Sequence, residues 1–250
     1  MTDAHCHVAR GASRHFLCDP CDGGAGPRDV RFAGAHPWFA DSFDAAALRA
    51  RLSGDSRLGV GEIGLDRLRS RDMPPQMRAA FESQLEIAAE FRRPVVLHGA
   101  KCWGEVVKTI ERLGASSRGG SGVPAFLFHG FSRSDGLLPA VFAMNGFVSV
   151  GPAILNDHAV NYREMARRIP RDRLLVESDC TAENSAECPP VEAVAAKLAE
   201  VRGEPLEALA ARLEENADRF LESCGRRCRW QEAGEMKPET VGMQGGEVAG

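Results

Sequence analysis

The chain lacks any apolar run long enough to cross a membrane. Its 250 residues contain no stretch near the ~18–20 consecutive apolar residues that a membrane-spanning helix needs. The N-terminus also lacks a basic segment followed by an apolar one, so no secretory signal is visible. Eight cysteines are scattered along the chain without the spacing of a disulfide framework. We therefore expect a cytoplasmic protein with reduced thiols and no membrane association.

A surplus of positive charge is also missing. Lys and Arg number 31 against 35 Asp and Glu, which gives a net charge of −4. This balance excludes a dedicated, strongly basic nucleic-acid binder, but it allows an enzyme with a locally basic cleft. Neither a Gly-x-Gly-x-x-Gly motif after a predicted strand nor a P-loop is present, so no nucleotide-binding fold is indicated.

Short apolar runs alternate with longer amphipathic segments. Runs such as Val95-Val96-Leu97 and Leu174-Leu175-Val176 are continuously apolar, which is typical of strands buried on both faces. The predicted strands are Thr2–His7, His15–Cys18, Val30–His36, Leu58–Gly64, Pro94–Gly99, Ala125–Phe131, Gly146–Pro152 and Leu174–Asp179. The predicted helices are Phe43–Leu52, Met73–Phe91, Trp103–Leu113, Ser134–Met144, Ala159–Arg168, Pro190–Arg202 and Leu206–Cys224.

This alternation predicts an α/β fold with parallel strands and crossover helices. Eight candidate strands suit a (β/α)8 TIM-type barrel, and a doubly wound open sheet is the alternative. No linker divides residues 1–230, so we expect one domain there. Residues 231–250 are rich in Gly and Glu without apolar periodicity, which predicts a disordered tail.

Side chains that bind metals gather at the ends of the predicted strands. In a parallel barrel these ends converge on one face, which is where such folds place their active sites. His5 and His7 are two residues apart in a strand and can therefore face the same metal. Imidazole and carboxylate ligands together suit zinc, manganese or iron, and they tolerate magnesium. The candidate ligands are His5, His7, Glu62, His98, His129 and Asp179.

Each candidate has a plainer explanation. Glu62 could form a structural salt bridge, although a buried strand carboxylate without a cation would carry a large desolvation cost. His98 and His129 could each be a satisfied core histidine, and Asp179 could cap a helix. The number of such residues at strand ends favours a metal site over these alternatives.

The ligand set predicts hydrolysis by a water that two divalent cations activate. Asp179 is placed to accept the proton of that water, and Glu62 would bridge the metals. Glu177 and Asp66 would orient the ligands and select histidine tautomers. A simple ion pair between Glu177 and a barrel arginine is an equal alternative.

The motifs resemble those of the TatD-type metal-dependent hydrolases, which are amidohydrolase-like TIM barrels. The resemblance runs from Asp3 to about Phe220, with Gln84 and Asn216 also matching. The matching motifs are Asp3-x-His5-x-His7, Gly34-x-His36-Pro37, Gly61-Glu62-Ile63-Gly64-Leu65-Asp66, Pro94-Val95-Val96-Leu97-His98, Phe128-His129-Gly130-Phe131 and Glu177-Ser178-Asp179.

The resemblance implies a monomeric, metal-dependent deoxyribonuclease, often a 3′–5′ exonuclease on single-stranded DNA or RNA, that uses two magnesium, manganese or zinc ions. It also implies roles for the site residues. One metal would be bound by His5, His7, Glu62 and Asp179. The other metal would be bound by Glu62, His98 and His129. His36 would contact the scissile phosphate.

Three departures from the family pattern affect the substrate cleft. Ala100 replaces an arginine found in many members, and the neighbouring Lys101 could bind phosphate in its place. The usual helix between the first two strands is largely missing before His36, which reduces the barrel near its first βα unit. Ser178 replaces a threonine, and the proline that commonly follows is delayed to Pro189.

Further residues near this face could contact nucleic acid. The basic candidates for phosphate binding are Arg67, Arg69, Arg71 and Arg133, although a solvated loop explains them equally well. Trp38, Phe39 and Trp103 could stack on bases or could be packing residues.

Two other functions stay open. The same fold could hydrolyse a carboxylic ester, lactone or amide, as in aminoacyl-tRNA deacylation, because function resides in the site and not in the scaffold. A non-catalytic binding module is the third possibility. The local arginines and lysine favour a phosphate-bearing substrate, and therefore a nuclease.

Overall fold

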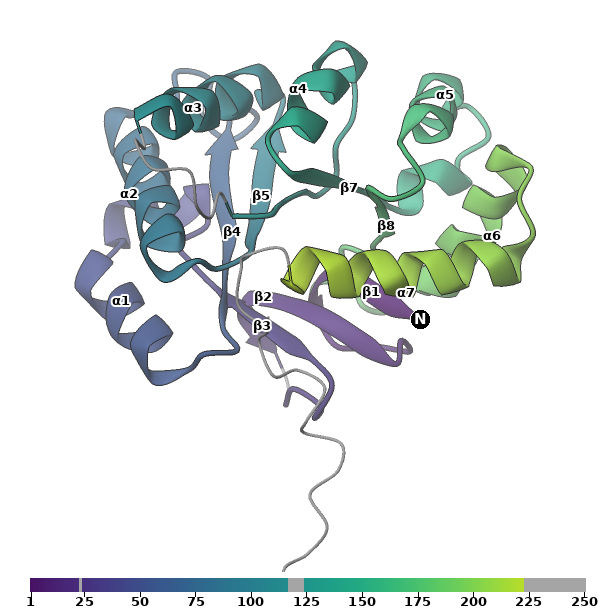
Figure 1. The fold of residues 1–250 in the computed structure, drawn as a ribbon, viewed down its shortest axis with the longest axis horizontal. Helices are drawn as coiled ribbons and strands as arrows, with labels where there is room; N and C mark the ends of the chain where they lie inside the picture. The colour runs from purple at the N-terminus through teal and green to yellow at the C-terminus, as the bar shows by residue number, and fades with distance from the viewer. Residues whose placement is uncertain (23, 117–123, 223–250) are drawn as a thin grey trace, which may run out of the picture.

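The computed structural model describes residues 1–22, 24–116 and 124–222. Eight parallel strands form one sheet in the order in which they occur along the chain (Figure 1). The strands are β1 (Thr2–Val8), β2 (Arg14–Asp22), β3 (Val30–Ala33), β4 (Gly59–Asp66), β5 (Val95–Ala100), β6 (Phe126–Phe128), β7 (Gly146–Val150) and β8 (Leu174–Val176). The predicted parallel α/β architecture is confirmed.

The sheet curls into a nearly closed barrel. The residues that follow β8 bond to β1, with the Asp179 amide donating to the His5 carbonyl at 3.1 Å and the His7 amide to the Cys180 carbonyl at 2.8 Å. The alternative of an open doubly wound sheet is therefore wrong. The helices are α1 (Ala45–Gly54), α2 (Pro75–Phe91), α3 (Trp103–Ser116), α4 (Leu138–Ala143), α5 (Val160–Arg168), α6 (Val191–Arg202) and α7 (Leu206–Glu222).

The first part of the barrel is reduced further than the sequence predicts. Residues 9–13 alone join β1 to β2, which is shorter than the usual parallel crossover of about a dozen residues. No described helix lies between β2 and β3 either (Figure 1). Polar pairs flank these strands instead: His15 Nδ1 lies 2.9 Å from Asp29, and Arg51 lies 2.5 Å from Asp19.

The interior of the barrel is closed at its base by α7. Phe220 packs against Phe16, Phe32 and Phe147, with ring centroids 5.8, 6.2 and 5.6 Å away. Asn216 donates from Nδ2 to the carbonyls of Arg171 and Leu174, each at 2.8 Å. The helix is thereby fixed under the barrel by buried aromatic contacts and by backbone hydrogen bonds.

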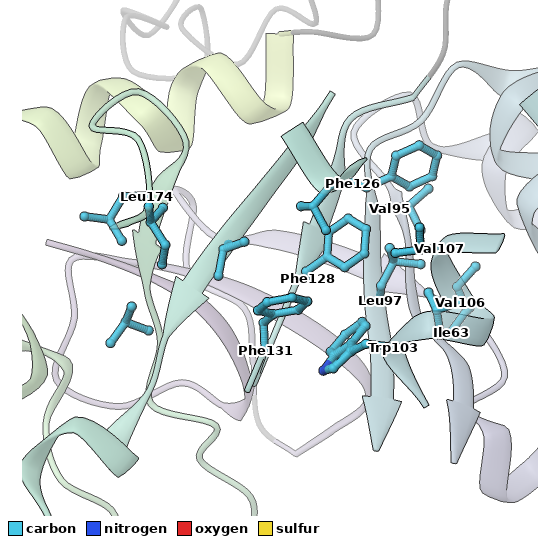
Figure 2. Close-up of a cluster of buried hydrophobic side chains, with 14 of the residues drawn as sticks. Ile63, Val95, Leu97, Trp103, Val106, Val107, Phe126, Phe128, Phe131 and Leu174 are labelled. Carbon is cyan, nitrogen blue, oxygen red and sulfur yellow. The ribbon is translucent and has the colours of Figure 1, made fainter. Parts of the chain in front are cut away.

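A second apolar layer lies between the sheet and its outer helices. Trp103 at the start of α3 packs against Phe128 and Phe131, each 5.4 Å away between ring centroids (Figure 2). Val106 and Val107 of the same helix complete the contact with the strands. Trp103 is buried here, so it is a packing residue and does not contact bases.

Several strands end earlier than predicted. The strand expected to reach His36 ends at Ala33, and those expected to reach Phe131 and Asp179 end at Phe128 and Val176. The chain leaves the sheet because the site residues need loop conformations: Gly130 and Asp179 have φ values of 57° and 52°. The helix predicted from Ser134 is a 3-10 turn, η2 (Asp135–Leu137), followed by the short α4.

Four predictions are not tested by this fold. The tail at 231–250 lies outside the described residues. A single domain over residues 1–230, a monomeric state and a cytoplasmic location stay predictions. Among the described helices, none has both the length and the apolar character required to cross a bilayer.

Candidate metal centre

Five histidine side chains surround one buried carboxylate. Glu62 is 2% exposed and comes from the middle of β4, whose residues are all buried. The imidazole nitrogens of the five histidines lie 2.5 to 3.7 Å from a Glu62 oxygen. These histidines are His5, His7, His36, His98 and His129. The histidines expected on one face of the barrel lie together there, and they meet at Glu62.

The charge of Glu62 is stabilised by its neighbours. Burial alone would raise the pKa of Glu62, but the interactions with His129, His5 and His98 outweigh burial and hold the pKa well below its usual value. His36 behaves in the opposite way, because burial lowers its pKa to about 4. Burial alone would lower the pKa of His98 and of His129, but the charge of Glu62 outweighs burial and raises both. A cation bound beside Glu62 would take the place of the protons on these two imidazoles.

The candidate ligands form three groups that each bring their donor atoms within 4.8 Å of one another. The groups are His5, His129 and Asp179; His5, His7 and Glu62; and His36, Glu62 and His98. Two of the groups therefore share Glu62. The structure places His36 with His98 where the resemblance gives that position to His129.

One buried histidine nitrogen has the surroundings of a metal ligand. Within the described part of the chain, His5 Nε2 is buried without a hydrogen-bond partner. It faces Glu62 Oε2 at 3.5 Å and Asp179 Oδ1 at 3.4 Å, which leaves an unused donor set between them. Because a buried unpaired polar atom is costly, this arrangement fits a divalent metal ion.

Asp179 lies at the mouth of the site. Its side chain is 52% exposed, whereas Glu62 is enclosed. Ser178, the residue before it, is fixed by Asp3, whose carboxylate accepts from the Ser178 amide at 2.9 Å and from the Ser178 hydroxyl at 2.5 Å. Desolvation by burial raises the pKa of Asp3 to about 6 despite these bonds.

Asp66 orients His98 from behind. Its Oδ2 atom lies 3.2 Å from His98 Nε2 and accepts from Trp38 Nε1 at 2.7 Å. Oδ1 accepts from the amides of Leu68 and Arg69 at 2.7 and 2.9 Å. Burial opposes ionisation of Asp66, but these hydrogen bonds prevail and lower its pKa. The predicted orienting contact with a candidate ligand is present.

Glu177 lies behind His129 in the same way. Its carboxylate accepts from the Gly130 amide at 2.7 Å and from the Ser149 hydroxyl, and it lies 3.8 Å from His129 Nδ1. These contacts involve no arginine, so the alternative of a simple ion pair with a barrel arginine is wrong. The structure is consistent with an orienting role.

The candidate phosphate-binding residues lie on loops after the strands. Arg67 follows β4 and forms an ion pair with Glu105 of α3. Lys101 and Arg133 are exposed and follow β5 and β6, each with a positive φ. These positions are on the same face as the histidines, and the contact with phosphate stays a prediction.

Some residues that shape the site have little sequence signal. Gln84 of α2 accepts from the Ala35 amide at 2.7 Å and donates to the Ala35 carbonyl at 3.2 Å, which fixes the loop that carries His36. Ser149 and Ser178 bind carboxylates behind the ligands. Only Gln84 and Ser178 fall within the family motifs, and nothing in the sequence marks Ser149.

Two cavities open on either side of the cluster. One of about 480 Å³ is lined by Asp179, Tyr162 and Asn184, and one of about 250 Å³ is lined by His36, Phe39 and Arg51. The cluster therefore adjoins one cavity at Asp179 and the other at His36.

Known proteins share this architecture. A solved structure of YjjV, a TatD homologue from Escherichia coli, superposes with a TM-score of 0.72 at 20% identity and covers 88% of this chain and 97% of its own. A hydrolase of the TatD family from Entamoeba histolytica superposes with a TM-score of 0.67 at 13% identity, covering 84% and 85%. These likenesses describe the fold.

Sequence relatives cover less of the chain. The metal-dependent hydrolase YabD of Bacillus subtilis is 27% identical over 55% of this chain and 51% of its own length. The 3′-5′ ssDNA/RNA exonuclease TatD of Edwardsiella piscicida is 31% identical over 58% and 53%. The TatD exonuclease of Pectobacterium carotovorum is 29% identical over 76% of each chain. The chain thus spans about half the length of the first two relatives.

The family model described as TatD related DNase matches residues 27–222, from the segment before β3 to the end of α7. The match begins after the two strands that lack their helices. It includes Glu62, His98, His129 and Asp179. The chain belongs to the TatD-related DNase family.

Proposed function

We propose that the protein is a metal-dependent nuclease that hydrolyses phosphodiester bonds of single-stranded nucleic acid, with single-stranded DNA as its substrate and 3′–5′ exonuclease action. The observation that carries the proposal is the ring of five histidines around the buried carboxylate of Glu62. Exonuclease action on single-stranded DNA and RNA is what the names of two relatives state.

Two divalent cations, which are magnesium, manganese or zinc ions, would bind among the histidines that surround Glu62. On the family's pattern, His5, His7, Glu62 and Asp179 would bind one, and Glu62 would share the other with His98 and His129, whose nitrogens lie 2.5 and 2.7 Å from Glu62 Oε1. The proximity of His36 to Glu62 and His98 makes it a further candidate for the second ion. When bound, such cations lower the pKa of water and stabilise the charge that develops on phosphate.

The side chains around this position have separable tasks. Asp179 is half exposed at the mouth of the site, where its carboxylate can accept the proton of the attacking water. Asp66 would fix the ring of His98 from behind, and Glu177 lies 3.8 Å from His129 Nδ1, where it would favour a proton on that nitrogen. Glu62 supplies the central negative charge, and its burial excludes competing water from that oxygen pair.

The basic residues would bind the phosphate chain. Lys101 and Arg133 are exposed on loops after neighbouring strands, and Arg67 reaches the same face through its pair with Glu105. His36, at the other side of Glu62, would contact the scissile phosphate if it does not bind the second ion. Basic side chains on the loops beside the cluster suit the binding of a phosphate backbone.

The test is cleavage of single-stranded DNA labelled at either the 3′ or the 5′ end, with magnesium or manganese. We expect mononucleotide release that depends on metal, that begins at the 3′ end, and that is lost in Asp179→Asn. The matched control is Asp172→Asn, which removes an exposed carboxylate before β8 at the opposite end of the barrel and should retain activity. Metal-loaded protein that cleaves neither DNA nor RNA would contradict the proposal and favour ester or lactone substrates.

A further inference from the structure

Exposed apolar side chains are concentrated beside the candidate metal centre. Five large hydrophobic residues are exposed in the described part of the chain, and three of them lie on the loops that follow β3 and β4. These three are Trp38, Phe39 and Leu68, with exposed fractions of 48, 52 and 63%. Exposed apolar groups that cluster at the mouth of a site mark a binding surface more often than single scattered ones do.

The Trp38 side chain is exposed, but its orientation is fixed by contacts. Its Nε1 donates to Asp66 Oδ2 at 2.7 Å, so the orientation of the indole is fixed by a carboxylate that also contacts His98. The guanidinium of Arg69 lies over the ring, 4.7 Å from its centroid. About half of the side chain nevertheless remains open to solvent. A flat, immobilised and half-open ring next to a cation is an arrangement that receives another flat ring.

The ring is close enough to serve the reaction site. The Trp38 and His36 rings meet edge to face with centroids 4.9 Å apart, and His36 in turn lies 4.5 Å from the His98 ring. A group stacked on Trp38 would therefore lie beside the phosphate-contacting side of the cluster.

We propose that Trp38 and Arg69 form a stacking subsite for one unpaired nucleobase of the substrate strand, next to the scissile phosphate. The proposal rests on the nuclease function and adds a specificity element to it. A base paired in a duplex cannot leave its neighbours without an unstacking cost, so the subsite favours single strands. Stacking accepts any base, because each base offers an aromatic face, and the subsite therefore selects strandedness and not sequence.

Asp66 connects the subsite to the candidate metal centre. The same Oδ2 atom contacts Trp38 and His98, so a base that holds the indole in place also holds the carboxylate that orients His98. We therefore expect Trp38→Ala to affect both binding and turnover. Trp38→Phe keeps a ring for stacking but removes the hydrogen bond to Asp66, so it should retain binding better than turnover.

The first test reads binding without cleavage. Trp38 fluorescence is followed while a short oligothymidylate is added to the Asp179→Asn protein, and the same titration is made with Trp38→Phe in that background. We expect quenching in the first protein that the second lacks, because the other tryptophans are common to both. Equal quenching in the two proteins would overturn the subsite.

The second test locates the base. A series of oligonucleotides with a single abasic position is bound to wild-type and Trp38→Ala protein. At one position the abasic change should weaken wild-type binding about tenfold, which is the value of one base–aromatic stack, and should have no further effect on Trp38→Ala. Leu68→Ala is the control, because Leu68 is an exposed neighbour without an aromatic face. In this variant the abasic change should weaken binding as it does in the wild type.

The outcomes separate this proposal from the nuclease function. Suppose that the wild type cleaves single strands, but that the binding losses from Trp38→Ala and from the abasic change add up at every position. This result would overturn the subsite and leave the nuclease function intact. Trp38-dependent quenching without cleavage of any nucleic acid would overturn the nuclease and leave the base-binding subsite. A wild type that neither binds nor cleaves single strands would overturn both.

Discussion

Glu62 lies at the centre of the other candidate ligands. Its carboxylate is buried in β4, and five imidazoles approach it from four strands: two from β1, one from β5, and two from the residues that follow β3 and β6. A buried carboxylate in such a position needs compensating charge, and Glu62 raises the pKa of His98 and His129, so these two imidazoles carry part of that charge as cations. A divalent cation supplies that charge directly.

Replacing Glu62 should therefore remove metal binding. Glu62→Gln keeps the shape but loses the charge, and we expect metal affinity to fall by more than the ~10–100-fold that contacts behind a ligand contribute. Metal content of the purified variants, measured by plasma mass spectrometry, tests this expectation.

Glu177→Gln is the matched control, because Glu177 is similarly buried but lies behind His129, where it accepts from Gly130 and Ser149. Its loss should stay within that ~10–100-fold range. Wild-type metal content in Glu62→Gln would be incompatible with a central role for this carboxylate.

The sequence predicts the ligand residues well and their surroundings poorly. The spacing of His5 and His7 and the glycine-flanked Glu62 are visible, because strand parity and burial act on neighbouring residues. The contact of Trp38 with Asp66, or of Ser149 with Glu177, joins separate strands and loops. Such pairs depend on the twist and closure of the barrel, which no local pattern contains.

At the level of elements, α2 holds the loop that carries His36. Gln84→Ala would leave the amide and carbonyl of Ala35 unpaired in a partly buried place, which costs about 1–3 kcal/mol. We expect a lower melting temperature and a weakened activity, because His36 loses its support. Gln76→Ala, at an exposed position of the same helix, should change neither the melting temperature nor the activity. Thermal unfolding and activity assays of the two variants test this expectation.

The junction of α6 and α7 depends on one carboxylate. Glu204 accepts from Arg202 Nε at 2.9 Å and from Arg212 at 2.6 Å, and Arg202 donates in turn to the Ala166 carbonyl. Burial opposes its ionisation, but the contacts with Arg202 and Arg212 prevail and lower the pKa of Glu204 below 4.5.

Because the pKa of Glu204 is lower in the folded state, its ionised carboxylate stabilises the fold at any pH above the pKa of the unfolded state. This stabilisation is lost as the pH falls through the pKa of the folded state. Glu204→Gln should therefore cost about 1–3 kcal/mol at pH 7 and progressively less in acid. Chemical denaturation of the wild type and the variant, at pH 7 and at acid pH, measures the difference in the free energy of unfolding. Glu207→Gln, exposed on the next turn, should behave like the wild type at each pH; a constant deficit in Glu204→Gln at all pH values would contradict the charge-based explanation.

Element boundaries show where sequence patterns stop being informative. The continuous apolar core of β5 predicts its position within a residue or two, because burial on both faces is recorded in the residue types. The strands before His36, His129 and Asp179 end early, because these ligands need backbone directions that a strand does not offer. β2 extends well past Cys18, since its polar residues pair with Asp29 and Arg51 and show no apolar period.

At the scale of the molecule, the barrel is closed at the base by α7 and open at the face that carries the ligands. Phe220→Ala removes the ring that three other phenylalanines contact, and a buried Phe→Ala change costs about 3–5 kcal/mol. We expect the free energy of unfolding to fall by this amount. Leu206→Ala, on the exposed start of the same helix, should stay within about 0.5 kcal/mol of the wild type.

The whole fold was the easier part to predict from the sequence. Eight strand patterns separated by amphipathic helices leave few topologies open, and parallel right-handed connections reduce them to a barrel or an open sheet. The choice between the two depends on the bonds from Asp179 and His7 to the opposite end of the chain. The departure from eight full βα units is visible only as a short polar segment before β3.

The central claim is that the carboxylate of Glu62 and its five histidines form a divalent metal centre. The most direct measurement is an anomalous difference map from crystals of the protein loaded with manganese. The account predicts peaks within coordination distance of Glu62 and of at least two of the surrounding imidazoles. Well-ordered ligand side chains with no anomalous peak at Glu62, in crystals whose manganese appears elsewhere or not at all, would contradict it.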